Sequence, residues 1–174
     1  MILAAGCAGP PADPGTLRLT WSSDPATLDP AQAVDVVGGS AVSLLYSGLV
    51  AFDRDGNVIP ALASAWELAA DGATYRFTIP EDRTASDGTP LDAAAVAASF
   101  RRLLSPETAS PRAWVLERIR GAAAFRAGEA DDVPGLRVTG PTVLEVELER
   151  PSASFLGLLA MPSACVVAPG VPAD

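Results

Sequence analysis

Residues 86–108 constrain the fold more than any other stretch, because they combine a turn, a capped helix and a helix stop. Thr89 is expected to cap the helix, Pro90 to occupy its first position and Asp92 to close a capping box. The serine–proline pair at 105–106 is expected to end the helix, since a residue before proline avoids the helical conformation. Apolar residues at helical spacing predict a core-facing stripe, made of Leu91, Val96, Phe100, Leu103 and Leu104.

Turn signals between alternating apolar runs predict antiparallel hairpins elsewhere in the chain. Asp55-Gly56, Asp71-Gly72 and Gly140-Pro141 are the expected turn centres. The expected strands are 17–21, 48–52, 58–59, 66–69, 74–79, 136–139, 142–149 and 165–168. The expected helical segments, besides the one described above, are 40–47, 60–65, 113–120, 121–128 and 152–161. This order of elements predicts an α+β fold, with antiparallel hairpins and covering helices.

Composition excludes several functional classes. The chain has 174 residues, a net charge of −9 and only 12 basic residues, which argues against nucleic acid as a partner. It has no histidine, so histidine-dependent catalysis and the commonest transition-metal ligand are absent. Cys7 and Cys165 are far apart without a CxxC motif, and the acid-rich loop from Asp53 lacks the glycine and glutamate positions of an EF-hand. We therefore expect no metal and no cofactor.

An enzyme is also disfavoured by the residues that remain. The chain contains no lysine, so only carboxylate pairs could supply acid–base chemistry. The glutamates at 145, 147 and 149 alternate with apolar residues and are expected on one solvated strand face. We therefore name no catalytic residue.

The N-terminus resembles the tail of a lipoprotein signal. Small residues directly precede Cys7, and the Pro/Gly-rich stretch that follows has the composition of a flexible tether. We expect residues 1–16 to be a signal remnant with its tether, Cys7 to be lipidated and translation to start upstream of Met1. The alternative is an unstructured start with a chance cysteine, since Ala4 stands where a lipobox usually has leucine. No stretch of the sequence is long and apolar enough to span a bilayer.

A series of segments in register resembles one protein family, the extracellular solute-binding proteins of peptide-type ABC importers (solute-binding protein family 5). The segments that carry the resemblance include Thr27-Leu-Asp-Pro-Ala31, Leu45-Tyr-Ser-Gly-Leu49, Asp55-Gly-Asn-Val-Ile-Pro60, Asp71-Gly-Ala-Thr-Tyr75, Ser86-Asp-Gly-Thr-Pro90, Ser105-Pro-Glu-Thr-Ala109 and Phe155-Leu-Gly-Leu-Leu159. Turns and buried aromatic residues explain many of these positions, so the signature identifies a scaffold.

The resemblance implies a fold and a function. The fold would be periplasmic-binding-protein-like, of type II and the peptide-binding class. Residues 17–174 would form part of the N-terminal lobe, matching the opening third of a two-lobed protein that is either a fragment or a truncated gene product. The function would be capture of oligopeptides, dipeptides or a similar small solute for an ABC permease and ATPase. The protein would be a monomer. It would be held at the extracytoplasmic face of the membrane through a lipid anchor, or would lie in the periplasm. The alternative is a ligand-sensing or truncated non-transport relative.

The resemblance also implies where the ligand would lie. The positions that match the family's binding segments are Ala33, Val34, Asp35, Val36, Arg112 and Trp114. At the position of Val34, oligopeptide binders resemble one another in having a carboxylate. At the position of Arg112 they have a tyrosine. The chain departs from their pattern at both positions. Asp35 either pairs with a ligand amine or caps a helix that begins near Val36. Arg112 either recognises a carboxylate or is solvated at a turn, and Trp114 either contacts ligand or belongs to the core.

Overall fold

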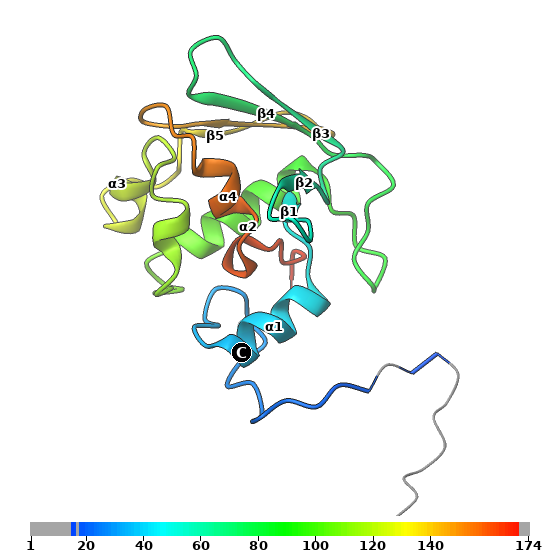
Figure 1. Cartoon of the computed structure of the whole chain (residues 1–174). Helices are drawn as coiled ribbons and strands as arrows, with labels where there is room; N and C mark the ends of the chain where they lie inside the picture. The colour runs from blue at the N-terminus through cyan, green and yellow to red at the C-terminus, as the bar shows by residue number, and fades with distance from the viewer. Residues whose placement is uncertain (1–14, 17, 171–174) are drawn as a thin grey trace, which may run out of the picture.

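The computed structural model describes residues 15–16 and 18–170 (Figure 1). The predicted lipidation site, Cys7, lies outside the described residues. None of the described helices is long and apolar enough to cross a membrane. The helices and strands described below all lie within residues 18–170.

The β part consists of a two-stranded and a four-stranded antiparallel sheet. The smaller sheet pairs β1 (Val50–Phe52) with β2 (Val58–Pro60). The larger sheet has the order β3-β4-β6-β5, with β3 (Ala65–Leu68), β4 (Thr74–Thr78), β5 (Leu136–Gly140) and β6 (Val143–Glu147). All three predicted hairpins are confirmed, because each Asp-Gly or Gly-Pro turn lies between paired strands.

Helices cover one side of the larger sheet. The helices are α1 (Val36–Leu45), α2 (Ala93–Leu104), α3 (Ala122–Arg126) and α4 (Phe155–Leu159), with single 3₁₀ turns η1 (Ala113–Val115) and η2 (Pro162–Ala164). In Figure 1 the sheet forms the top of the molecule, α2 and α4 lie beneath it, and α1 lies farthest away. α2 packs on β5 and β6, α4 packs on β1, and η2 packs on α1. The α+β class is confirmed.

The predicted stripe of α2 is the centre of the core. Val96, Phe100, Leu103 and Leu104 are fully or almost fully buried, and Leu91 packs against the same cluster. The sheet contributes alternate residues of its central strands, Tyr75, Phe77, Leu144 and Val146. The predicted serine–proline helix stop is confirmed at Ser105, which is the C-cap.

The start of α2 differs from the prediction. Asp92, and not Thr89, is the N-cap, and its Oδ1 accepts the N–H of Ala95 at 2.8 Å. Thr89 is drawn into a local pairing of the preceding loop, because its carbonyl accepts the N–H of Ala85 at 2.8 Å and Leu91 donates to Arg83 at 2.9 Å. The loop 83–91 therefore holds Pro90 and Leu91 extended and delays the helix.

Other predicted elements are wrong or shorter. Residues 18–21 and 165–168 form no strand, because none of the described strands pairs with them. Residues 61–64 are bends and not helix. The helix expected over 113–120 is the single turn η1, because Ile119 leaves it to bridge Leu148. The helix expected to begin at Ser152 is the shorter α4, with Ser154 as its N-cap.

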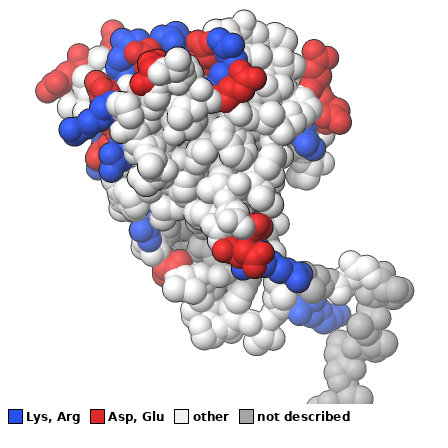
Figure 2. Space-filling model, turned by 45° about the horizontal axis from the view of Figure 1, so that its top comes forward, with Lys and Arg blue, Asp and Glu red and all other residues white. Residues whose placement is uncertain are grey.

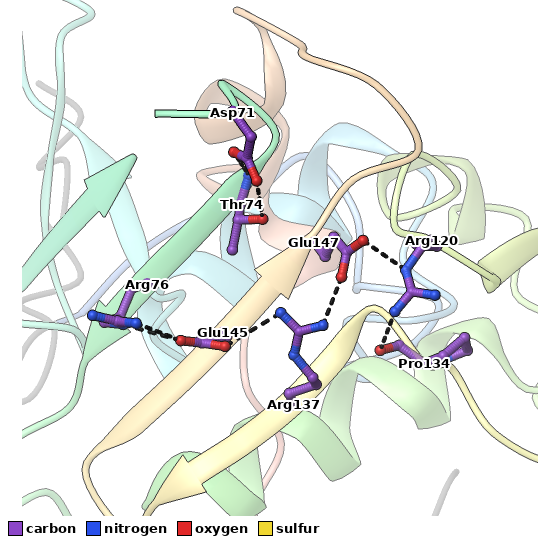
Figure 3. A network of polar contacts seen from close by, with 8 residues as sticks. All are labelled: Asp71, Thr74, Arg76, Arg120, Pro134, Arg137, Glu145 and Glu147. Carbon is purple, nitrogen blue, oxygen red and sulfur yellow. Dashed lines mark hydrogen bonds and ion pairs between the residues drawn. The ribbon is translucent and has the colours of Figure 1, made fainter. Parts of the chain in front are cut away.

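The outer face of the larger sheet carries a ladder of ion pairs. Figure 2 shows charged side chains gathered over the sheet, and Figure 3 shows the ladder itself. Arg76 lies 2.7 Å from Glu145, which also pairs with Arg137 at 3.3 Å. Arg137 and Arg120 then share Glu147, at 2.6 and 2.8 Å. The predicted outer face is correct for Glu145 and Glu147, but their side chains are only 14% and 27% exposed, because arginines pair with them, and Glu149 lies beyond the end of β6.

Candidate functional site

The first predicted binding segment, residues 33–36, follows a buried turn. Thr27 Oγ1 accepts the Asp29 N–H at 3.0 Å, and Asp29 Oδ1 accepts the Ala31 N–H at 2.9 Å. Arg102 of α2 donates to both carboxylate oxygens of Asp29, at 3.0 and 2.6 Å. Burial raises the pKa of Asp29, but the hydrogen bonds from Arg102 and the Ala31 N–H lower it by more, so the net pKa lies below its usual value. The turn is thus held in place by the charged pair of Asp29 and Arg102.

Further contacts fasten the segment after this turn to residues 108–112. Gln32 donates its amide to the carbonyl of Thr108 at 2.6 Å, and Ser110 donates its hydroxyl to the carbonyl of Ala31. Arg112 Nη2 donates to the carbonyl of Val34 at 2.6 Å. The two segments that sequence analysis named separately are therefore one surface.

This surface lines a hollow of about 200 Å³. Its polar members are Asp35, Arg112 and Ser163. Its apolar members are Ala33, Val34, Val36, Gly39, Met161 and Pro162. Five of the six predicted site residues meet here, and α1 and η2 close the hollow from two sides.

Asp35 is the N-cap of α1, since its Oδ1 accepts the Gly38 N–H at 2.8 Å. This confirms the capping interpretation of Asp35, and the carboxylate also lines the hollow. Val34 and Val36 are 53% and 83% exposed, so two apolar side chains project beside it. Ala33 is buried and supports them from below.

Trp114 is not part of this hollow. It is 42% exposed, so the core interpretation is wrong, because η1 is too short to turn its side chain inward. It lines a separate hollow of about 440 Å³ together with Arg118, Arg150 and Leu158. The structure therefore divides the predicted site residues between two places.

Sequence analysis missed Met161, Pro162 and Ser163. Met161 is the last residue of the predicted helix 152–161 and the other two follow it, and no local motif marks them. They reach the hollow because η2 packs against α1, which lies more than a hundred residues earlier in the chain. Ser163 is 6% exposed, and its Oγ has no hydrogen-bond partner among residues 15–16 and 18–170.

A larger hollow, of about 640 Å³, lies between the end of α1 and the loop 83–91. It is lined by residues such as Leu45, Leu62, Arg83 and Ala168, and none of the predicted site residues lines it. Among residues 15–16 and 18–170 there is no group of three or more Cys, Asp or Glu side chains that could hold a metal ion. The chemistry available at the predicted site is therefore that of carboxylate, guanidinium, hydroxyl and apolar groups.

The chain is similar to known proteins over most of its length. Residues 57–172 match the sequence model of the bacterial extracellular solute-binding proteins, family 5, middle region. The probable deoxycholate-binding periplasmic protein YgiS of Escherichia coli K12 is 39% identical over 149 residues, which are 84% of this chain and 28% of that protein. The murein peptide-binding protein MppA of the same organism is 34% identical, over 79% of this chain and 26% of its own length.

Solved structures give the same result. The substrate-binding domain of an oligopeptide ABC transporter from Bacillus anthracis superposes with a TM-score of 0.82 at 30% identity, over 86% of this chain and 29% of that one. Unliganded MppA in its open form superposes with a TM-score of 0.78 at 32% identity, over 83% of this chain and 28% of that one. The chain thus spans little more than a quarter of the length of the relatives it matches.

Proposed function

Because the chain belongs to family 5 of the bacterial extracellular solute-binding proteins, we propose that it is part of the substrate-binding component of a peptide-type ABC importer. It captures oligopeptides, dipeptides or a similar small solute outside the cell for import. The observation that carries the proposal is the Arg112–Val34 contact at 2.6 Å, which joins both predicted binding segments into one wall.

The relatives support a solute-binding role with an open choice of ligand. Their names specify deoxycholate, murein peptide and oligopeptides in turn. One scaffold therefore serves different solutes, and the side chains of the wall select among them.

The proposed ligand contacts are Ala33, Val34, Asp35, Val36 and Arg112, with Trp114 at a separate point of the surface. The role is binding without chemistry, because these side chains include no activated nucleophile and no acid–base pair. Asp35 and Arg112 supply the charges, and the two valines supply the apolar contact. In the whole protein, closure of a second lobe over this wall would enclose the ligand.

The proposed setting is the extracytoplasmic face of the cytoplasmic membrane or the periplasm. Residues 1–16 are proposed to be a signal remnant with its tether, and residues 17–174 part of the N-terminal lobe. Cys7 is proposed to carry the lipid anchor. The partners are the permease and ATPase of the importer, and the protein acts as a monomer.

The alternative is a sensing protein that uses the same wall without a transporter. Uptake distinguishes the two. A strain lacking the gene should lose uptake of a radiolabelled peptide mixture, such as casein hydrolysate, and regain it with the wild-type gene. Unchanged uptake, with a lost transcriptional response to the same peptides, would exclude the transport role and support sensing.

A further inference from the structure

We infer that the hollow at Arg112 receives a carboxylate carried on an apolar group. This inference rests on the proposed function and concerns the class of solute that the wall selects. It differs from recognition of a free amine, which the carboxylate of Asp35 would otherwise suggest.

Arg112 is the cation of the hollow, and most of its donors are unused. A guanidinium carries five N–H donors in a planar fork. Among the described residues only the Val34 carbonyl accepts from this fork, at 2.6 Å from Nη2. No carboxylate of the described residues lies within ion-pair distance of Arg112, whereas Arg76, Arg101 and Arg102 all have such a partner. The contact with Val34 also fixes the fork in place, which lowers the entropy cost of binding an anion.

The rest of the hollow favours an apolar body on the ligand. Val34 and Val36 are exposed, and Met161 and Pro162 line the same hollow. Exposed apolar side chains around one fixed cation match a ligand that has one anionic end and an apolar remainder. The volume of about 200 Å³ suits a small group such as a leucine-sized side chain.

Asp35 is placed to serve α1 more than a ligand. Its Oδ1 is already the acceptor for the Gly38 N–H at 2.8 Å, and the side chain stabilises the helix N-terminus. A ligand amine would have to share this carboxylate with the helix. Among the described residues, the fork of Arg112 has no such competing partner of opposite charge.

Ser163 is a further polar residue that lines the hollow. Its hydroxyl is buried and has no partner in the described part of the chain, which is a costly state for a polar group. A carboxylate oxygen bound at the hollow would offer the acceptor that this hydroxyl lacks. Arg112 and Ser163 would then both donate hydrogen bonds to the carboxylate.

Such a carboxylate can come from the C-terminus of a peptide or from a non-peptide organic acid. N-acetyl-alanyl-leucine and isocaproate represent these two sources. Alanyl-leucinamide, which bears a free amine and no carboxylate, is the counterpart of the peptide acid. Isocaproamide, which is neutral, is the counterpart of isocaproate. The four probes separate the carboxylate from the amine and from the apolar group.

The test is a ¹⁵N-correlation NMR titration of the 174-residue chain. We expect both acids to shift the amide signals of residues 36–39 and 161–164 and the Arg112 Nε–H signal. Affinities should be weak, because one open wall buries little of a ligand. The two amides should bind at least about tenfold more weakly, since a hydrogen bond to a charged group contributes about 1.5 kcal/mol or more.

Variants separate the contributions of the side chains. Arg112→Gln should weaken binding of the acids by about tenfold or more, while Arg118→Gln, an exposed arginine outside the hollow, should leave it unchanged. Asp35→Asn keeps a good helix cap but removes the negative charge that lines the same hollow as Arg112, so it should strengthen binding of the acids. Ser163→Ala should weaken it while leaving the stability of the chain unchanged or slightly higher.

If only one of the two acids binds, that acid identifies the source of the carboxylate. The inference is supported whichever of the two acids binds. The inference is overturned if alanyl-leucinamide shifts these signals while the acids do not, and also if no probe shifts them. The proposed function is tested separately by the uptake measurement. If the deletion strain loses peptide uptake but neither acid shifts the NMR signals, the importer role is retained and the proposed ligand class is rejected.

Discussion

Arg102 and Asp29 form a two-pronged ion pair that joins α2 to the turn preceding the binding segment. Nη1 lies 3.0 Å from Oδ1 and Nη2 lies 2.6 Å from Oδ2. The Asp29 side chain is only 4% exposed and that of Arg102 is 23% exposed. The most regular helix of the fold therefore fixes the position of residues 31–36, and through them the wall of the hollow.

Replacing Asp29 should destabilise the fold strongly. Asp29→Asn leaves the guanidinium of Arg102 without its counter-charge, and the free energy of unfolding should fall by about 3 kcal/mol. Urea denaturation measures this. Asp24→Asn, an exposed aspartate in the same loop, is the control and should change it by less than about 0.5 kcal/mol. Equal losses in the two variants would contradict the role of the ion pair.

The same pair predicts a pH dependence of stability. The folded-state pKa of Asp29 lies below its usual value, so the folded state binds this proton less readily than the unfolded state. Its contribution is present in full above the unfolded pKa of about 3.9 and is lost as the pH falls toward the lower folded pKa. The gap in unfolding free energy between wild type and Asp29→Asn should therefore be wide at neutral pH and narrow in acid. A gap that stayed constant would count against the charged pair.

Gly121 should tolerate no side chain. Its φ is +79°, and a Cβ there would overlap the ring of Pro134. Gly121→Ala should lower the unfolding free energy by about 3 kcal/mol, from strain and overpacking together. Gly128 has a similar φ of +73° with no atom within 4 Å of a built Cβ, so Gly128→Ala should cost only about 1 kcal/mol. Thermal or urea unfolding of both variants would show whether the difference exists.

Phe100 and Trp114 should behave oppositely, despite similar size. Phe100 is 1% exposed at the centre of α2, and Phe100→Ala should cost about 4 kcal/mol. Trp114 is 42% exposed, and Trp114→Ala should cost about 1 kcal/mol or less. If Trp114→Ala were the more damaging change, the exposed position of this side chain would be wrong.

Cys165 should react slowly in the folded chain. Burial raises the pKa of its thiol to about 11. At pH 8 only about one molecule in a thousand would then carry the reactive thiolate. In a Cys7→Ser background, reaction with a chromogenic disulfide should be slow in buffer and fast in guanidinium chloride. Equally fast reaction in both would show that the thiol is accessible.

The sequence was informative wherever local chemistry decides structure. The Asp71-Gly72 turn needs only a carboxylate and a residue of positive φ, and Oδ1 of Asp71 accepts the N–H of both Ala73 and Thr74. The cap at Asp35 and the stripe of α2 depend on neighbours a few residues away. These features could therefore be predicted, and they are confirmed.

Features that depend on distant residues could not be predicted. Thr89 has the chemistry of a cap, but the pairing of loop 83–91 takes it away from the helix. The Asp29–Arg102 pair spans 73 residues, and no motif relates its members. Ser163 joins the hollow only because η2 packs on α1. A strand pattern at 18–21 forms no strand among the described residues, since a strand also requires a partner.

The most direct test of the binding wall is hydrogen exchange of the intact gene product, with and without a casein peptide mixture. We expect slower exchange with peptides at residues 33–39, 110–115 and 161–164, and no change across β5 and β6, whose outer face carries the ion-pair ladder. Protection confined to the sheet, or no protection of these segments at saturating peptide, would contradict it.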